Sequence, residues 1–242
     1  MIDPAIAIAI QDLVIANRIM AHEGVIDDFG HVAVRNPLNP DHYFISCSRS
    51  PELVDREDIM EMDMNDQPID QRGRSMYKER VIHSAIFKAR PDVNAVVHHH
   101  AKELLPFTIT GMHEKFRPAM HLAAVLGKHI PFWDSQTDFG DTNMLIETPE
   151  QGDSCARALG PNTCLMLRGH GANCVAANLQ QVVFISVQMR ENAALLLHAL
   201  PMGAVTYLTD GEIEQTQAMQ LGENPMTRAW DYRKTRAGYQ GI

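Results

Sequence analysis

The residues best suited to chemistry lie in one short run, Asn94–His100, whose sequence is NAVVHHH. Side chains alternate between the two faces of a strand, so a strand that ends here turns His98 and His100 to one face and His99 to the other. A further candidate, His170, lies between two glycines after an apolar run, where backbone freedom allows its side chain to be directed into a cleft. The spacing therefore predicts a pair of imidazoles and a third that can join them.

Three neutral imidazoles with an open coordination position are the usual form of a catalytic divalent-metal site. The alternative for His98 and His100 is a pair of surface polar residues, or half of an adventitious metal clamp. Glu79 adds a carboxylate upstream, although the helix dipole alone also favours a carboxylate at a helix start. We predict one divalent ion per subunit, held by these histidines together with His170. Three histidines suit zinc, manganese, cobalt or iron alike.

The surrounding sequence resembles the class II aldolase and adducin family. The resemblance extends over about residues 9–199 and is carried by the runs KERVIHSAIFKARPDVNAVVHHH and LRGHGANCVAANL. Family members carry a glutamate at the start of a helix, an H-x-H at the end of the following strand and a later histidine. These match Glu79, His98, His100 and His170.

The resemblance implies a three-layer α/β/α fold around a mainly antiparallel sheet. It also implies a homotetramer with active sites between subunits. At 242 residues with 45% hydrophobic content, the chain can bury one large core, so we expect a single domain over residues 1–242. A helical tail is expected over about residues 205–242.

Capping residues, turn formers and apolar spacing predict the individual elements. The expected helices cover about residues 3–23, 78–90, 101–105 (broken by Pro106), 118–126 and 178–200, with two more opening near residues 209 and 226. A hairpin is expected from strands 31–35 and 42–47. The acidic stretch 54–73 is interpreted as a short solvated connection or ribbon.

Charge and cysteine usage limit the partners and the compartment. A net charge of −9 argues against nucleic acid and anionic membranes, because basic surfaces bind both. The four cysteines lack paired metal spacing and lie mostly in apolar surroundings, which favours reduced thiols and the cytoplasm. The apolar N-terminus lacks a basic region and polar residues soon interrupt it, so neither a signal peptide nor a transmembrane segment is predicted.

Several positions depart from the sugar-phosphate aldolases of the family. Those enzymes hold phosphate with a Gly-Asn turn, a Thr-Gly loop and a Ser-Ser pair, where this chain has Gly30-His31, Ser48-Arg49 and Tyr77-Lys78. Bulky cationic and aromatic groups fill the space that a phosphate needs, while Arg49 offers a planar fork suited to a carboxylate. A tyrosine that follows the Pro-x-x-His segment in the aldolases is Leu122 here. The substrate is therefore expected to be a small organic acid rather than a sugar phosphate.

Relatives with similar sequence around GH-V-VR and SRSPELV include decarboxylases of hydroxylated aromatic or pyridine dicarboxylates. Decarboxylation and aldol cleavage both break a C–C bond, leave a carbanion that a metal ion can stabilise through an adjacent oxygen, and end with protonation of carbon. We therefore predict a metal-dependent lyase that decarboxylates a hydroxylated aromatic or heteroaromatic (di)carboxylate.

The remaining candidate residues have predicted roles and plain alternatives. Glu79 is a fourth ligand or a free base, and a histidine supplies protons. The proton donors are His31 or His121; the substrate-binding residues are Arg49, Ser48, Tyr77, Lys78 and, as an interfacial acid, Tyr232. A strand-end hydrogen bond is the alternative for His31, a surface salt bridge for Arg49, and packing or solvent exposure for Tyr77 and Lys78.

Two other classes of protein stay open. One is an aldolase that cleaves a non-phosphorylated hydroxy-keto acid or sugar-derived substrate, with the same metal and with Glu79 as base. The second is a non-catalytic scaffold like adducin, although this chain retains all the matching metal ligands. Metal content separates the scaffold from the two enzymes.

Overall fold

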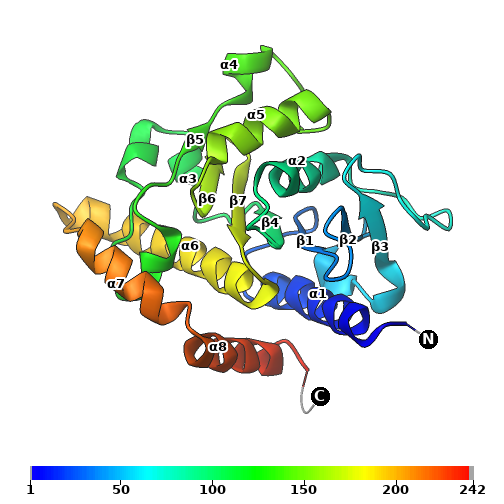
Figure 1. Ribbon diagram of the computed structural model, residues 1–242. Coiled ribbons are helices and arrows are strands. Elements are labelled where there is room, and N and C mark those ends of the chain that lie inside the picture. The colour runs from blue at the N-terminus through cyan, green and yellow to red at the C-terminus, as the bar shows by residue number, and fades with distance from the viewer. Residues whose placement is uncertain (1, 240–242) are drawn as a thin grey trace.

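The computed structural model describes residues 2–239 and is built around a seven-stranded sheet (Figure 1). The strand order is β3-β2-β1-β4-β7-β6-β5, and every neighbouring pair is antiparallel except β5 and β6. The strands are β1 (His31–Arg35), β2 (His42–Ser46), β3 (Ile59–Asp63), β4 (Ala95–His99), β5 (Phe132–Trp133), β6 (Cys164–Leu167) and β7 (Gly171–Ala176). The expected α/β fold with a mainly antiparallel sheet is confirmed.

Helices cover both faces of this sheet (Figure 1). They are α1 (Pro4–His22), α2 (Val81–Ala89), α3 (Leu105–Thr108), α4 (Ser135–Phe139), α5 (Pro149–Leu159), α6 (Leu179–Ala199), α7 (Asp210–Gln220) and α8 (Glu223–Arg236). One core cluster joins α1 and α6 to strand residues such as Val32 and Val97, and a second joins α2 and α5 to Ala33 and Val96. Alternate residues of each central strand thus enter different cores.

Several sequence-based expectations are confirmed at the ends of the elements. The Asp3 side chain accepts a hydrogen bond from the Ala5 amide and begins α1, and the Asn178 side chain caps α6 through the Gln181 amide at 2.9 Å. The hairpin pairs β1 with β2, with Ala33 opposite Ile45.

Other expectations are wrong in whole or in part. Of the stretch interpreted as a solvated connection or ribbon, residues 59–63 form the edge strand β3, which agrees with a ribbon; it is not fully solvated, because Met60 and Met62 enter the core. The chain does not break at Pro106, because this proline lies in the first turn of α3, where its missing N–H costs nothing. Residues 121–126 form a 3-10 turn rather than an α-helix. The helix expected from residue 78 begins at Val81, after a 3-10 turn.

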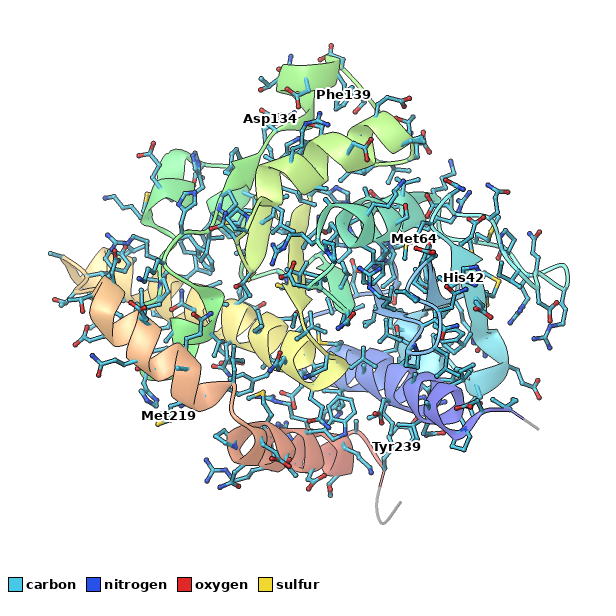
Figure 2. All side chains as sticks on the ribbon, in the orientation of Figure 1. His42, Met64, Asp134, Phe139, Met219 and Tyr239 are labelled. Atoms are coloured by element: carbon cyan, nitrogen blue, oxygen red, sulfur yellow. The ribbon has the colours of Figure 1, made fainter. Side chains whose placement is uncertain are left out.

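The C-terminal tail is fastened to α1. Arg233 and Arg236 both pair with Glu23, at 3.1 and 2.9 Å. The guanidinium of Arg18 lies 5.5 Å from the ring centroid of Tyr239, which is labelled in Figure 2. α1 has the length and mean hydropathy (1.4) of a membrane span, but 39% of that window is buried, and it packs against β1, α6 and α8. Its apolar side is therefore part of the protein core.

Candidate metal centre and active site

Four side chains that could hold a metal ion meet at one end of the sheet. His98 is the second-last residue of β4, His100 follows the strand, His170 lies in the turn between β6 and β7, and Glu79 lies just before α2. One ligand atom from each of the four lies within 4.8 Å of the others. His98 Nε2 is 2.9 Å from His100 Nε2, and Glu79 Oε2 is 3.7 Å from His98 Nε2 and 3.6 Å from His170 Nε2. The structure thus brings together the four residues that the sequence singled out.

Strand alternation explains why His98 and His100, but not His99, reach this cluster. Val96 lies in the core of α2 and α5, so His98, two residues later, faces the same layer as Glu79. His99 turns to the α6 side, where its Nε2 is 3.7 Å from Cys174 Sγ. Cys174 Sγ in turn is 3.6 Å from Met189 Sδ of α6.

Hydrogen bonds to oxygen acceptors orient two of the imidazoles. His98 Nδ1 is 2.8 Å from Asn173 Oδ1, and His100 Nδ1 is 3.0 Å from Asp27 Oδ1. The Asn173 amide nitrogen donates to Cys155 Sγ, which fixes its oxygen toward His98. Since amide and carboxylate oxygens accept only, each Nδ1 carries the hydrogen and each Nε2 presents a lone pair to the cluster.

These lone pairs make the site fit a divalent cation. The Nε2 atoms of His98 and His100, 2.9 Å apart, would repel each other unless a cation or a proton lay between them. Burial lowers the pKa of His98 well below its usual value, and the neighbouring His100 and His170 lower it further. Burial also lowers the pKa of His100, although Asp27 opposes this. Both rings are therefore neutral at pH 7, which is the form that binds metal.

Sequence reasoning missed Asp27. Its Oδ1 accepts hydrogen bonds from the amides of Phe29 and Gly30 at 3.0 and 3.1 Å, so the turn before β1 holds the carboxylate beside His100. Burial would raise the pKa of Asp27, but the two amides and His100 outweigh it and hold the pKa below its usual value. An aspartate two and three residues before free amides is a common turn signal, yet that signal does not point to His100.

Glu79 is anchored by one oxygen. Its Oε1 accepts a hydrogen bond from the Ile146 amide at 2.9 Å, which leaves Oε2 directed at His98 and His170. The side chain is buried, and its backbone (φ −85°, ψ 16°) is not helical, so the residue belongs to the turn before α2. A carboxylate held in this way can act as a ligand or as a base through the same oxygen.

A cavity of about 550 Å³ opens in front of the cluster. Its apolar side is formed by Phe29, Met76 and Leu145, and Phe29 is 71% exposed. The other lining residues are His31, Ser48, Tyr77, Lys78, Glu79, His100 and His170. Apolar, cationic and metal-ligand groups around one opening suit a flat organic acid.

Besides Glu79, four of the predicted proton-transfer and substrate residues line this cavity. His31 is buried, and its ring centroid is 5.1 Å from that of His98; burial and then the nearby histidines lower its pKa well below the usual value. Lys78 is exposed, with its Nζ 3.7 Å from Glu147. The Tyr77 hydroxyl donates to the carbonyl of residue 49 and lies 3.2 Å from Ser46 Oγ. Ser48 is the fourth of these residues that line the cavity.

Arg49 is placed differently from the prediction. Its Nε donates to the Leu53 carbonyl at 2.8 Å and lies 3.2 Å from the Asp58 carboxylate. Within the described residues, Arg49 is not among those that line the cavity. The structure therefore places it in the surface salt bridge that was its alternative, because a carboxylate of its own chain lies within reach.

His121 and Tyr232 also lie away from this cavity in the described part of the chain. His121 begins the 3-10 turn His121–Leu126 and is exposed, with Nδ1 3.4 Å from the Gln220 amide. Tyr232 lies on α8, is 59% exposed, and has Arg236 5.3 Å from its ring centroid. Any catalytic role for either residue would require a neighbouring subunit.

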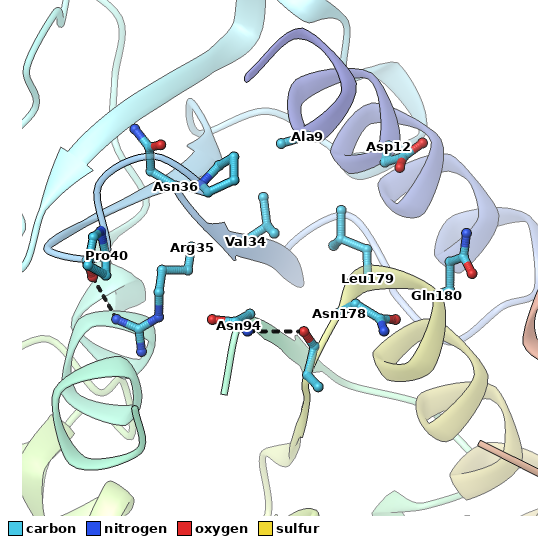
Figure 3. Close-up of a pocket in the computed structure, with 12 residues that line it drawn as sticks. Ala9, Asp12, Val34, Arg35, Asn36, Pro40, Asn94, Asn178, Leu179 and Gln180 are labelled. Carbon is cyan, nitrogen blue, oxygen red and sulfur yellow. Dashed lines mark hydrogen bonds between the residues drawn. The ribbon is translucent and has the colours of Figure 1, made fainter. Parts of the chain in front are cut away.

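Another cavity, about 660 Å³, lies at the opposite end of the sheet (Figure 3). It is lined by the last residues of β1, the residue before β4 and the first turn of α6, whereas the metal cluster uses the other ends of these strands. Its one arginine, Arg35, donates to the carbonyls of Pro40, Phe87 and Val93. Because the Arg35 guanidinium already donates to backbone carbonyls, it is not free to bind an anionic substrate. The size of this cavity is therefore not evidence that it is the active site.

Comparison with known proteins identifies the family. The model of the Class II Aldolase and Adducin N-terminal domain matches residues 11–197, and the chain belongs to this family. In fold, it is similar to L-fuculose 1-phosphate aldolase from Glaciozyma antarctica PI12, with a TM-score of 0.79 and 21% identity over 96% of this chain and 89% of that one.

Curated relatives with decarboxylase names align over nearly the whole chain. Decarboxylase tropJ of Talaromyces stipitatus is 27% identical over 246 residues, which cover 93% of this chain and 92% of the relative. The 3,4-dihydroxyphthalate decarboxylase of Arthrobacter keyseri is 24% identical over 235 residues, which cover 93% and 92%. The family and these relatives together support a lyase.

Proposed function

We propose that the protein is a divalent-metal-dependent decarboxylase of a hydroxylated aromatic or heteroaromatic (di)carboxylate. The observation that carries the proposal is the convergence of Glu79 with three histidines beside a cavity that combines an apolar wall with a cation. Full-length similarity to decarboxylases, one of which acts on 3,4-dihydroxyphthalate, supports the substrate class.

In this proposal His98, His100 and His170 hold the ion. When bound, a divalent ion supplies a Lewis acid that stabilises negative charge developing on a substrate oxygen. Asn173 and Asp27 hold the rings of His98 and His100 so that their Nε2 atoms stay directed at one point.

The cavity residues orient the substrate. Phe29, Met76 and Leu145 provide a surface on which a flat ring can lie. We assign the carboxylate that is retained to Lys78, the cation that lines the cavity, rather than to Arg49. Glu79 Oε2 is close enough to the cluster to take up or return a proton, while Oε1 remains on the Ile146 amide.

The experiment is metal analysis of the purified protein followed by CO₂ release measured over a substrate panel. The panel contains dihydroxyphthalates, hydroxypyridine dicarboxylates, hydroxy-keto acids and sugar phosphates. We expect a stoichiometric divalent ion and CO₂ release from a hydroxylated aromatic or heteroaromatic dicarboxylate. Protein that lacks metal, or that turns over no dicarboxylate with added metal, would contradict the proposal.

An aldolase acting on a non-phosphorylated hydroxy-keto acid is the second candidate. It is favoured by the family itself, since the same ion can stabilise an enolate after C–C cleavage. Retro-aldol products from the hydroxy-keto acids, without CO₂ from the dicarboxylates, would identify this activity. A scaffold role fits less well, because the complete ligand set has no use in a scaffold.

We also propose a cytoplasmic homotetramer whose active sites lie between subunits. The exposed position of Phe29 at the rim, and the distance of His121 from the cavity of its own chain, support a neighbour that completes the site. All four cysteines are buried free thiols, which suits a reducing compartment. Light scattering of the purified protein measures the oligomeric state.

A further inference from the structure

His83 is a buried histidine that none of the roles above uses. It lies in α2 with no exposed surface, and its Nε2 is 2.6 Å from His31 Nδ1. Within residues 2–239, its other nitrogen, Nδ1, has no hydrogen-bond partner. Burial lowers the pKa of His83 to about 3, so the ring is neutral under ordinary conditions. A neutral histidine therefore bonds to the one histidine that lines the cavity without joining the metal cluster.

The packing around His31 leaves one nitrogen for a ligand. Its ring lies between Tyr77, His83 and His98, with centroid distances of 4.7, 4.8 and 5.1 Å. Since Nδ1 is bonded to His83, only Nε2 is left to meet a molecule in the cavity. The chemistry of His31 thus depends on whether this Nε2 carries a hydrogen or a lone pair.

Two neutral rings can share the short hydrogen bond in two ways. If His31 Nδ1–H donates, the hydrogen of His83 must sit on Nδ1, where it has no acceptor, and His31 offers a lone pair to the cavity. If His83 Nε2–H donates, His83 keeps only an unused lone pair, and His31 carries its hydrogen on Nε2. Unpaired N–H groups are rarer in protein interiors than unpaired acceptors, which favours the second arrangement.

We propose that His83 is a positioning residue that donates its Nε2–H to His31 and so holds His31 Nε2–H toward the cavity as a hydrogen-bond donor to an anionic substrate oxygen. This deepens the proposed function and rests on it for the identity of the substrate. The expected substrate also favours a hydrogen on His31 Nε2. A lone pair directed at a carboxylate or phenolate oxygen would repel that oxygen, whereas an N–H stabilises it. His31 then acts as a neutral donor and not as a base.

The position of the hydrogen can be measured without turnover. Protein labelled with ¹⁵N-histidine is examined by long-range nitrogen–proton correlation spectra at pH 7.5, metal-free and with zinc, and a His31→Ala spectrum assigns the His31 signals. We expect a protonated Nε2 and an unprotonated, hydrogen-bonded Nδ1 for His31. A protonated Nδ1 would overturn the proposal whether or not the protein is a decarboxylase.

Variants test the positioning role. His83→Met removes the donor at similar volume and should lower kcat on the order of 10-fold. This is less than the roughly 10²- to 10³-fold cost of removing a donor to a developing anion outright, because His31 itself remains. His83→Gln keeps an N–H near the Nε2 position and should restore most of kcat. In the His31→Ala background, His83→Met should change kcat by less than about 2-fold, because residues in one chain of contacts are not additive.

The matched control is Ser84→Ala, which removes a neighbouring buried polar group of α2 that donates to Asp66 and not to His31. It should leave kcat unchanged even if it lowers the melting temperature. If His83→Met lowers kcat equally in the wild-type and His31→Ala backgrounds, His83 is only a packing residue. If the wild type releases no CO₂ from any panel member, the proposed function fails, while the spectra still decide the hydrogen position.

Discussion

At the scale of single residues, the histidines of the metal cluster depend on acceptors from distant parts of the chain. Asn173 is 75 positions from His98, and Asp27 is 73 positions from His100. Strand alternation and glycine flanks were enough to single out the three histidines that the structure brings together. They could not select Asn173 or Asp27, because the pairing of β4 with β7 and the turn before β1 bring these residues near only in the folded chain.

Replacing a ligand should remove the metal. We expect His100→Ala to lose bound metal and activity together while the melting temperature changes little, because the site lies at a cavity and not in the core. His99→Gln is the control, since His99 faces Cys174 on the opposite side of β4 and should keep its metal. Elemental analysis after gel filtration measures both; full metal retention by His100→Ala would remove the assignment.

Arg49 and Lys78 are predicted to differ in their effects on substrate binding. Lys78→Ala should raise KM roughly 5-fold, about 1 kcal/mol, because this exposed cation lines the cavity and solvent screens it. Arg49→Ala should leave KM within about 2-fold, since its guanidinium is engaged with Asp58. Steady-state kinetics on the substrate found in the panel compares the two. A larger KM effect for Arg49→Ala would mean that its side chain turns toward the substrate.

The stability of the protein should fall on acidification because of His83. In the unfolded chain a histidine gains a proton below about pH 6.5, whereas His83 in the folded protein resists protonation until about pH 3. Between these values the unfolded state binds more protons, so His83 lowers stability by about 1.4 kcal/mol for each pH unit below 6.5. His83→Met removes this dependence. Urea unfolding at pH 7.5 and pH 5 should show a smaller loss for the variant, by about 2 kcal/mol.

At the scale of elements, the close approach of β4 and β7 sets the position of His170. Gly171 begins β7 with φ 159°, and a Cβ added there would lie 2.1 Å from the His99 carbonyl oxygen. The next residue, Ala172, pairs with His99. Periodicity predicted that a strand ends at the histidines, and glycines indicated a turn at residue 170. The contact between the histidine strand β4 and the glycine turn before β7 depends on the order of strands in the sheet. The residue pattern along a single strand does not reveal that order.

Gly171→Ala should therefore disturb both the sheet and the metal site. The backbone of β4 cannot yield as a flexible side chain can, so we expect a loss of stability of about 1–3 kcal/mol and a weaker metal site. Gly111→Ala is the control, because a Cβ there meets no atom within 4 Å. Thermal unfolding and a zinc titration compare the two variants. Unchanged zinc affinity in Gly171→Ala would mean that the turn adjusts independently of β4.

At the scale of the whole molecule, the arrangement of helices on both faces of the sheet follows from patterns that are visible in the sequence. Successive apolar residues of β1 and β4 point alternately into the two cores. Capped helices such as α6 cover these cores. The edge strand β3 was expected only as a solvated connection or ribbon, because acidic residues alternate with its methionines and mask the burial of its apolar side. The pairing of Arg49 with Asp58 was also not predicted. Whether an arginine pairs with a carboxylate of its own chain or with a substrate depends on distances in the folded protein and not on residue type.

The sequence also predicts how subunits assemble, with active sites that lie between them. His121 was selected as a proton donor, yet it is exposed and lies outside the cavity of its own chain in residues 2–239. If it acts across a subunit interface, His98→Ala and His121→Ala should each be inactive alone. Mixed and reassembled, they should recover activity, because some sites then take His98 from one variant and His121 from the other.

The expected recovery follows from counting. Each site draws its His98 and its His121 independently from equal pools, so roughly a quarter of the sites contain both intact residues in a symmetric homo-oligomer. The measurement is CO₂ release after co-refolding at equal concentrations, with each variant refolded alone as the control. A His121→Ala protein that is fully active alone would assign His121 to the surface. If both variants are inactive alone and their mixture recovers no activity, His98 and His121 act in the site of the same subunit. That result would contradict the interfacial arrangement.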